Sequence, residues 1–272
     1  MWTLSSNLNM ARHSLAGCGT QGAALSFGGI SMEYGTTDET EIFDGTSWAF
    51  GSNLNTARRG LVGCGTALAG LGFGGDIGPN SDKTEEYDGT CWSAGGDMQV
   101  ALTFSAGGGT QAAALSFGGR QSTGSGTYPT YTYNGTAWAL DVNMNVHIQQ
   151  HAGCGSPSAA LSFGGYNGTF ITNKSEEYNG AVWASGGDLN TFVSLLSGSG
   201  TQVAGLALGG WADNRPLGDY TARTATYDGA AWAASDNLNT AKKELEGDGT
   251  QTASIVFGGY GDAGSLATTE QN

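Results

Sequence analysis

The sequence predicts an all-β fold in which one four-stranded unit recurs around a ring. The 272 residues include 48 glycines but only 4 prolines, which is not the composition of a disordered Pro/Gly tract. A second observation is a Phe-Gly-Gly or Leu-Gly-Gly element that recurs every 44 to 49 residues, with its glycine pairs starting at Gly28, Gly74, Gly118, Gly164, Gly209 and Gly258. A third is an aromatic-[Asp/Asn]-Gly-x-x-Trp element that ends at Trp48, Trp92, Trp138, Trp183 and Trp232. Repeats of this length are typical of solenoids, propellers and arrays.

Each repeat contains four predicted strands in a fixed order. The first ends in Gly-Cys-Gly, as at 17–19, and the second is an apolar run such as 23–27 that is closed by Gly-Gly. After a variable loop, the third strand ends at an aromatic residue, as at 84–87. The Asp-Gly or Asn-Gly that follows is a strong signal for a type I′ hairpin turn, and the fourth strand then carries the tryptophan. Four short antiparallel strands without helical periodicity are typical of a propeller blade.

The two chain ends are expected to share one blade. The sixth repeat contains no Trp strand of its own, whereas the chain begins with Trp2-Thr3-Leu4. We therefore expect the N-terminal strand to complete the C-terminal blade and remove the open edge of the ring. The predicted fold is a six-bladed β-propeller of four-stranded antiparallel blades, a single domain over 1–272, with approximate blades 3–48, 49–92, 93–138, 139–183, 184–232 and 233–272 plus 1–5.

The tryptophans that share the repeat register are expected to pack between neighbouring blades, because aromatic residues at fixed spacing usually belong to a core. These structural residues are Trp2, Trp48, Trp92, Trp138, Trp183 and Trp232. The many glycines and alanines are expected on the innermost strands, where little room is left around a narrow tunnel.

Composition excludes several kinds of partner. With 24 acidic and 10 basic residues the net charge is −14, which argues against nucleic acid and anionic membrane surfaces. No apolar run is long enough to span a bilayer, so no membrane insertion is expected. The first residues lack the basic and apolar regions of a signal peptide, and four cysteines do not form a disulfide scaffold. We therefore expect free thiols and synthesis in a reducing cytoplasm.

The motif set resembles the kelch repeat: an apolar run, Gly-Gly, a variable loop, a Tyr and then a Trp, over the whole chain. The particular variant, Leu-Asn-Thr-Ala-Arg, Gly-Cys-Gly-Thr-Gln, Ala-Ala-Leu-Ser-Phe-Gly-Gly and Thr-Glu-Glu-Tyr-Asp-Gly-Thr-x-Trp, looks like short kelch-like repeats of virion and tail-fibre-associated proteins of marine bacteriophages. Such repeats also occur in bacterial surface proteins. The resemblance implies a propeller, whereas a fold of this kind serves many functions.

Variation in length is confined to one segment of the repeat. The distance from the third-strand aromatic to the next glycine pair is 31 residues in all five cases, whereas 11 to 16 residues separate each glycine pair from the following aromatic. The variable loops therefore share one face with the Leu-Asn-Thr-Ala-Arg segments, and loops on a rigid scaffold often carry recognition. Their aromatic residues are candidates for sugar stacking or protein contacts, or else cover blade edges: Tyr34, Tyr128, Tyr166, Phe170, Trp211, Tyr220 and Tyr260.

Basic residues gather in one sector of the same face. At one register, blades six, one and two carry Lys242, Arg12 and Arg58, and at the next position they carry Lys243, His13 and Arg59. We expect Arg12, Arg58, Arg59 and Lys242 to form a local anion site for sulfated or carboxylated glycans or an acidic partner. The alternative is that these charges are solvated or pair locally with Asp and Glu.

Catalytic chemistry is not indicated by the remaining motifs. Cys18, Cys64 and Cys154 share one register around the ring, which is not the spacing of a zinc site, and His147 and His151 are too far apart on a strand for one metal ion. Copper radical oxidases and sialidases use propellers, but the oxidase ligand set has no match here. Asp44 lies four residues before Trp48, whereas the sialidase box has five. We expect a non-enzyme with neither cofactor nor metal.

The sequence thus favours a binding or structural module. The leading expectation is a phage virion or tail-associated propeller, made in the host cytoplasm, that recognises a host-surface polysaccharide or another virion protein. Alternatives are a purely structural virion decoration protein, a bacterial cell-surface adhesin or lectin, and, remotely, a sialidase- or oxidase-like enzyme.

Overall fold

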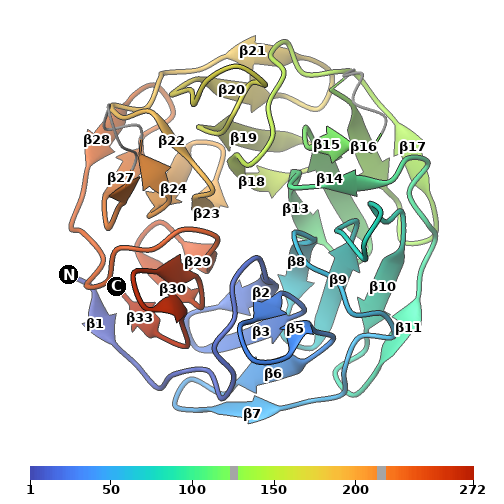
Figure 1. Ribbon diagram of the computed structural model, residues 1–272. Helices are drawn as coiled ribbons and strands as arrows, with labels where there is room; N and C mark the ends of the chain where they lie inside the picture. The colour runs from blue at the N-terminus through green and yellow to red at the C-terminus, as the bar shows by residue number, and fades with distance from the viewer. Residues whose placement is uncertain (123–127, 213–218) are drawn as a thin grey trace.

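The computed structural model describes residues 1–122, 128–212 and 219–272, and all regular secondary structure in these ranges is β. None of the described residues lies in a helix that is long and apolar enough to cross a membrane. Among them are six four-stranded antiparallel sheets, in each of which the strands pair in a simple meander. Figure 1 shows these sheets side by side around a central opening, with the two chain ends adjacent.

The sheets are numbered here along the chain, each from its innermost to its outermost strand. Sheets 1 to 3 consist of β2 (Ala16–Thr20), β3 (Ala23–Phe27), β6 (Thr40–Phe43) and β7 (Trp48–Phe50); β8 (Val62–Thr66), β9 (Ala69–Phe73), β10 (Thr84–Tyr87) and β11 (Trp92–Ala94); and β13 (Ala106–Thr110), β14 (Ala113–Phe117), β16 (Thr130–Tyr133) and β17 (Trp138–Leu140). Sheets 4 to 6 consist of β18 (Ala152–Ser156), β19 (Ala159–Phe163), β20 (Ser175–Tyr178) and β21 (Trp183–Ser185); β23 (Ser197–Thr201), β24 (Ala204–Leu208), β27 (Thr224–Tyr227) and β28 (Trp232–Ala234); and β29 (Glu246–Thr250), β30 (Ala253–Phe257), β33 (Thr269–Gln271) and β1 (Thr3–Leu4).

Short strands in the loops that follow the glycine pairs form small additional ladders, which in sheets 3 and 5 include a short strand just before the innermost strand. They are β4 (Ile30–Ser31) with β5 (Gly35–Thr36), β12 (Leu102–Thr103) with β15 (Arg120–Gln121), β25 (Trp211–Ala212) between β22 (Val193–Ser194) and β26 (Asp219–Tyr220), and β31 (Tyr260–Gly261) with β32 (Gly264–Ser265). These ladders give the variable loops a defined backbone.

The predicted pairing of the chain ends is present. Strand β1 lies antiparallel to β33, with Thr3 opposite Gln271 and Leu4 opposite Glu270. The amide of Asn239 donates to the Trp2 carbonyl, as the amide of Asn55 donates to the Trp92 carbonyl within sheet 2. Trp2 therefore occupies in sheet 6 the position that the other tryptophans hold in their own sheets.

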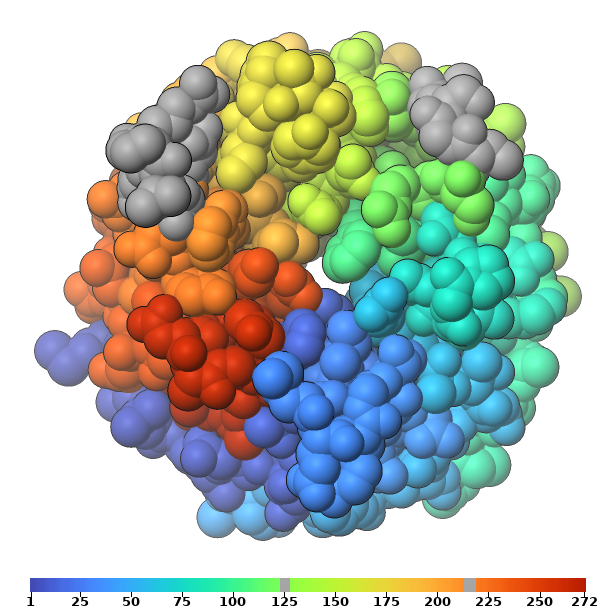
Figure 2. Space-filling view, viewed as in Figure 1, coloured from blue at the N-terminus to red at the C-terminus, as the bar shows by residue number. Residues whose placement is uncertain are grey.

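The innermost strands contact one another in the cyclic order β2, β8, β13, β18, β23, β29 and back to β2. A closed circle of six backbone hydrogen bonds links the residues just before them, each N–H donating to the preceding member's carbonyl at 2.8–3.0 Å. This mouth ring consists of Ser14, Gly60, Phe104, Gln150, Leu195 and Glu244. All six have φ between 50° and 57°, so five side chains occupy a left-handed conformation that usually favours glycine. Figure 2 shows the opening in the middle of this face.

The glycine pairs are explained by contact with the neighbouring sheet. The N–H of Gly29 donates to the carbonyl of Arg58 in the next repeat, and the same bond recurs at the second glycine of every pair. A Cβ at Gly28, which has φ of 65°, would lie only 2.7 Å from that Arg58 oxygen. A side chain there would push neighbouring sheets apart, so the repeat requires glycine.

All six register tryptophans are buried. The indoles of Trp92, Trp138 and Trp232 each lie 4.7 Å, centroid to centroid, from a phenylalanine of the preceding sheet, and their N–H groups donate to a Thr or Ser hydroxyl there. Trp48 closes the circle, because it packs on Phe257 and donates to Thr269, both of sheet 6. The core of the molecule thus lies between sheets.

Candidate functional site

A central cavity of about 250 Å³ lies inside the innermost strands and opens through the mouth ring. Glycine is the commonest residue of its wall, because at many positions the strands approach too closely for larger residues. A Cβ at Gly63, for example, would lie 2.1 Å from the Gly17 carbonyl oxygen of the adjacent strand. The acidic residues of the wall belong to one part of the ring: β29 of sheet 6 contributes Glu246 and Asp248, and the mouth ring contributes Glu244 just before that strand.

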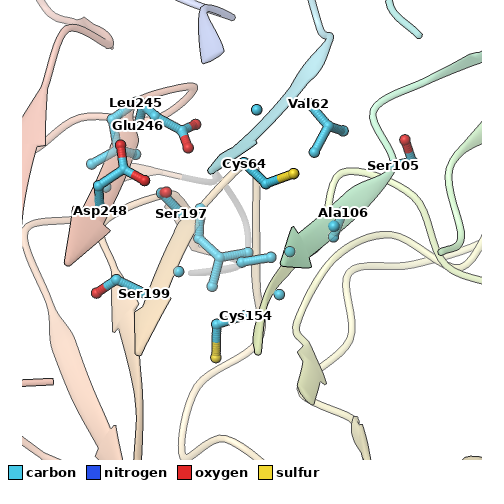
Figure 3. A pocket seen from close by; sticks show the side chains of 18 of the residues that line it. Val62, Cys64, Ser105, Ala106, Cys154, Ser197, Ser199, Leu245, Glu246 and Asp248 are labelled. Atoms are coloured by element: carbon cyan, nitrogen blue, oxygen red, sulfur yellow. The ribbon is translucent and has the colours of Figure 1, made fainter. Parts of the chain in front are cut away.

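Glu246 and Asp248 lie next to one another on the same side of β29, with Cys64 and Cys154 elsewhere on the wall (Figure 3). Burial raises the pKa of Glu246 well above its ordinary value, and the neighbouring Asp248 carboxylate raises it further. Burial also raises the pKa of Asp248 to about 7. Two carboxyl groups this close do not both ionise readily, so the pair retains a proton near neutral pH. Within the described ranges, no three His, Cys, Asp or Glu residues are arranged to hold a metal ion.

Three thiols at one register of the innermost strands pack against the next sheet, and two of them, Cys64 and Cys154, line the cavity. Cys18, Cys64 and Cys154 are buried, and each faces a threonine carbonyl of the next sheet, at 3.4, 4.0 and 3.5 Å. Burial raises the pKa of Cys64 and of Cys154 to about 12, so neither forms the nucleophilic thiolate at neutral pH. All four cysteines, including the exposed Cys91, are free.

The predicted exposed anion site at Arg12, Arg58 and Lys242 is wrong, because all three side chains are fully buried. Arg12 pairs with Glu41 at 3.0 Å, Arg58 with Glu85 at 2.9 Å and Lys242 with Glu270 at 3.4 Å. The two arginines also donate to backbone carbonyls at the glycine pair and at the start of the third strand. The alternative of local pairing therefore holds for these three, and Arg59 alone of the four remains half-exposed, beside Asp76.

The loop aromatics fall into two groups. Tyr34 and Phe170 are exposed, Tyr128 stacks on His147 with ring centroids 3.8 Å apart, and the Tyr166 hydroxyl donates to the Gly168 carbonyl. The Tyr128–His147 pair adjoins the Tyr166 loop, since a Cβ at Gly168 would lie 3.0 Å from the His147 ring. Trp211, Tyr220 and Tyr260, by contrast, meet around one cation, with Trp211 and Tyr220 on one loop and Tyr260 on the next.

The centre of this second group is Lys243. Its ammonium lies 5.0 Å from the Trp211 ring centroid, 5.9 Å from that of Tyr220 and 5.8 Å from that of Tyr260. Trp211 meets Tyr220 edge to face at 5.1 Å. We call Trp211, Tyr220, Tyr260 and Lys243 the aromatic cage.

His13, just before the first strand of sheet 1, and Glu244 of the mouth ring connect the aromatic cage to the central opening. His13 packs on Tyr260 at 5.0 Å, and its other side lies 3.9 Å from the Glu244 carboxylate. Glu244 also pairs with Lys243 at 3.6 Å and accepts the Ser14 hydroxyl. Burial lowers the pKa of His13 and thus favours its neutral form, an effect that the Glu244 carboxylate opposes. A cation surrounded by π faces, beside the mouth ring, suits an anionic group joined to a flat or sugar-like body.

Sequence reasoning missed the centre of the aromatic cage. Lys243 lies beside Lys242 in the basic sector, but the anion site expected from the sequence includes Lys242 and not Lys243. Alternation along the backbone carried the information: the position of Arg12 points into the sheet, and the next position points out. The acidic pair on β29 is also detectable in the sequence, since the other five repeats have only uncharged Ala, Val, Ser, Cys or Gly at the positions of Glu246 and Asp248.

No protein-family model matches this chain, and the search of curated proteins finds no significant relative.

Proposed function

We propose that this protein is a six-bladed β-propeller that acts as a non-catalytic recognition module. The aromatic cage on the variable face binds an anionic glycan or an equivalent acidic group of a partner. The observation that carries the proposal is the convergence of three aromatic rings from two variable loops on the Lys243 ammonium. The packing of the repeat does not require three aromatics there, because in the part of the chain that the structure describes the other cation over a ring, Arg120, meets Phe104 alone.

The chemistry of the aromatic cage matches the proposed ligand. Tyr and Trp faces stack on the apolar face of a sugar ring, while the ammonium attracts a carboxylate or sulfate. On a chain of net charge −14, this local cation gives an anion one favourable place to bind. The likeness of the repeats to those of marine phage virion proteins supports a place on a virion, with host-surface polysaccharide or another virion protein as partner.

A glycan array read at low and high salt tests the proposal. Purified protein is compared with Lys243→Gln and Trp211→Ala, and with Tyr34→Ala, an exposed aromatic of another loop, as the matched control. We expect binding of acidic glycans that falls about tenfold in each cage variant, since a cation–π or charge-assisted contact contributes about 1–2 kcal/mol. High salt should weaken binding, because it screens the charge.

Equal losses in the Tyr34→Ala control would move the site away from the aromatic cage. An absence of glycan binding in the wild type would reject the glycan ligand and favour the alternative of a structural virion subunit, to be sought by co-purification with virion proteins.

The ring itself is tested by truncation. Deleting residues 1–5 removes β1 and the buried Trp2, so sheet 6 loses its outer strand. We expect a loss of at least about 3–5 kcal/mol of unfolding free energy, the usual cost of removing one buried tryptophan. An unchanged melting temperature would reject the closed ring.

A further inference from the structure

One glutamate recurs as the second residue of the third strand, and it binds the backbone of the segment before the first strand. Glu41, Glu85, Glu176 and Glu270 hold this position in sheets 1, 2, 4 and 6. Their carboxylates accept backbone N–H groups of one or two consecutive residues at 2.6–3.4 Å, namely Asn9 and Met10, Asn55, Asn145 and Val146, and Asn239 and Thr240. The fold thus contains a carboxylate-binding N–H pair that is repeated from sheet to sheet.

Sheets 3 and 5 have no glutamate at this position, and they differ in what replaces it. In sheet 3 the position is Tyr131, whose buried side chain fills the space together with Leu102. In sheet 5 it is Ala225, and the position of Arg12 is the short Val193. Ala207 stands where sheet 1 has Ser26, so three small side chains adjoin.

A cavity of about 190 Å³ occupies this place in sheet 5. It is lined by Asn190, Thr191, Val193 and Ala225, and Arg223 and Asn237 also contribute to the wall. The backbone of the segment keeps the conformation of the other sheets. Leu189 N–H donates to the Asn173 carbonyl as Leu54 N–H donates to the Asp38 carbonyl, and the Asn190 amide donates to the Trp232 carbonyl as that of Asn55 does to Trp92. The N–H groups of Asn190 and Thr191 therefore stand where a carboxylate is bound in sheets 1, 4 and 6, yet they have no acceptor among the residues that the structure describes.

We propose that the sheet 5 cavity binds a small carboxylate ligand, whose carboxylate accepts the N–H groups of Asn190 and Thr191 and whose apolar body lies against Val193, Leu196 and Ala207. Sheets 1, 4 and 6 show that a carboxylate satisfies both N–H groups of this pair, and sheet 2 shows it for the first of them, in each case with a glutamate of the chain itself. The Arg223 guanidinium on the wall adds positive charge, and no carboxylate of the described residues lines the cavity. A dry cavity of about 150 Å³ is known to hold benzene, so this one accommodates an acid of about eight heavy atoms.

This site is separate from the aromatic cage, since Trp211, Tyr220, Tyr260 and Lys243 do not line it. Its failure would therefore leave the proposed recognition function untouched.

Calorimetric titration with sodium hexanoate tests the proposal, with hexanamide and hexylamine as ligands that lack the negative charge. We expect one hexanoate per chain and at least about tenfold weaker binding of both control ligands, because the N–H pair is satisfied best by a charged acceptor. Ala225→Glu places the chain's own carboxylate on the N–H pair, so it should abolish hexanoate binding and raise the melting temperature. The matched control is Thr226→Glu, since the neighbouring register carries Glu86 and Glu177 in sheets 2 and 4.

A gain of binding makes the test stricter. Glu176→Ala removes the carboxylate from sheet 4, which has the apolar Ile148 at the position of Arg12, and should create a second hexanoate site. The proposal is overturned if wild-type protein takes up no hexanoate at millimolar concentration, or if Ala225→Glu folds and still binds it. Equal binding of hexanamide would reject the carboxylate as the recognised group.

Discussion

Sheets 6, 1 and 2 form one half of the ring and sheets 3, 4 and 5 the other, and the two halves fill the same internal position differently. In the first half, a buried cation meets a buried glutamate: Lys242 with Glu270, Arg12 with Glu41, and Arg58 with Glu85. In the second half the cation is replaced by Leu102, Ile148 or Val193. The same backbone therefore accepts an ion pair or an apolar fill.

The comparison shows that the two positions of the pair must change together. In sheet 3 both the cation and the glutamate are replaced, by Leu102 and Tyr131, and these two buried side chains fill the space between the strands. Sheet 5 also exchanged both, but for residues too small to fill it, which leaves the cavity described above. Sheet 4 exchanged only the cation, so Glu176 remains beside Ile148 without one, and burial raises its pKa.

The ion pairs also differ within their half. Each arginine satisfies two carbonyls besides its glutamate, whereas Lys242, among the residues that the structure describes, donates to the Thr268 hydroxyl and lies 3.4 Å from Glu270. Burial lowers the pKa of Lys242 to about 8, an effect that the Glu270 carboxylate only partly offsets. A planar guanidinium satisfies several acceptors at once and stays charged, which an ammonium does not do as well.

The largest effect is expected from breaking one ion pair. Arg58→Leu leaves Glu85 buried without its cation, which should cost about 3–5 kcal/mol of unfolding free energy. Urea unfolding followed by tryptophan fluorescence measures the loss. The double variant Arg58→Leu/Glu85→Tyr copies sheet 3 and should recover most of it. A double variant no more stable than the single one would show that the two halves are not interchangeable.

Glu176 gives the next largest effect, and it depends on pH. Folding raises the pKa of this carboxyl. Its contribution to the free energy of unfolding is therefore complete below the pKa of the unfolded chain, where the carboxyl is protonated in both states, and it is lost as pH rises through the pKa of the folded protein. Glu176→Gln retains an oxygen for the Asn145 N–H without the charge, so it should be more stable than wild type at pH 7, by about 1 kcal/mol, and nearly equal at pH 4. Equal stability at both values would mean that the buried charge is not penalised.

A substitution of His151 tests the second half of the ring at another internal position, three residues after Ile148. It stands where four repeats have Leu15, Leu61, Leu196 and Leu245, and among the described residues its ring nitrogens have no well-formed hydrogen bond and only a weak contact with the Phe117 backbone. Burial lowers the pKa of His151 to about 3. Below pH 6.5 the unfolded chain takes up a proton on this imidazole that the folded protein does not, so the free energy of unfolding falls as pH falls toward 3. His151→Leu should raise the melting temperature by a few degrees and remove that part of the acid sensitivity. Thermal unfolding at pH 7 and pH 5 measures both, and a lower melting temperature at pH 7 would indicate a hidden partner for the imidazole.

Lys242→Arg is expected to have the smallest effect. If the guanidinium reaches the Gly258 and Thr268 carbonyls as Arg12 reaches those of Gly28 and Glu39, stability should rise by about 1 kcal/mol. Unfolding at pH 9 sharpens the test, because the lysine of the wild type has then lost its charge in the folded state. A variant less stable than wild type would show that sheet 6 is shaped around the shorter cation.

The repeat period, the strand order and the pairing of β1 with the last sheet followed from the sequence alone. Gly-Gly, Asp-Gly and the register tryptophans impose backbone conformations or burial wherever they occur, so their meaning does not depend on distant contacts. The predicted strands at 23–27 and 84–87 are confirmed to the residue. The uniform distance from aromatic to glycine pair likewise identified the loops that carry Trp211, Tyr220 and Tyr260.

Only the tertiary structure decided where the charges lie and which aromatics meet. Arg12 and Arg58 look like surface residues in the sequence, because their partners Glu41 and Glu85 lie 29 and 27 residues away on another strand. Lys243 differs from Lys242 only by pointing outward, and the aromatic rings reach it from loops 32 and 17 residues away. The sheet 5 cavity is likewise the sum of three small residues on three strands. Local rules determine a repeat, whereas burial and empty space are properties of residues brought together by the fold.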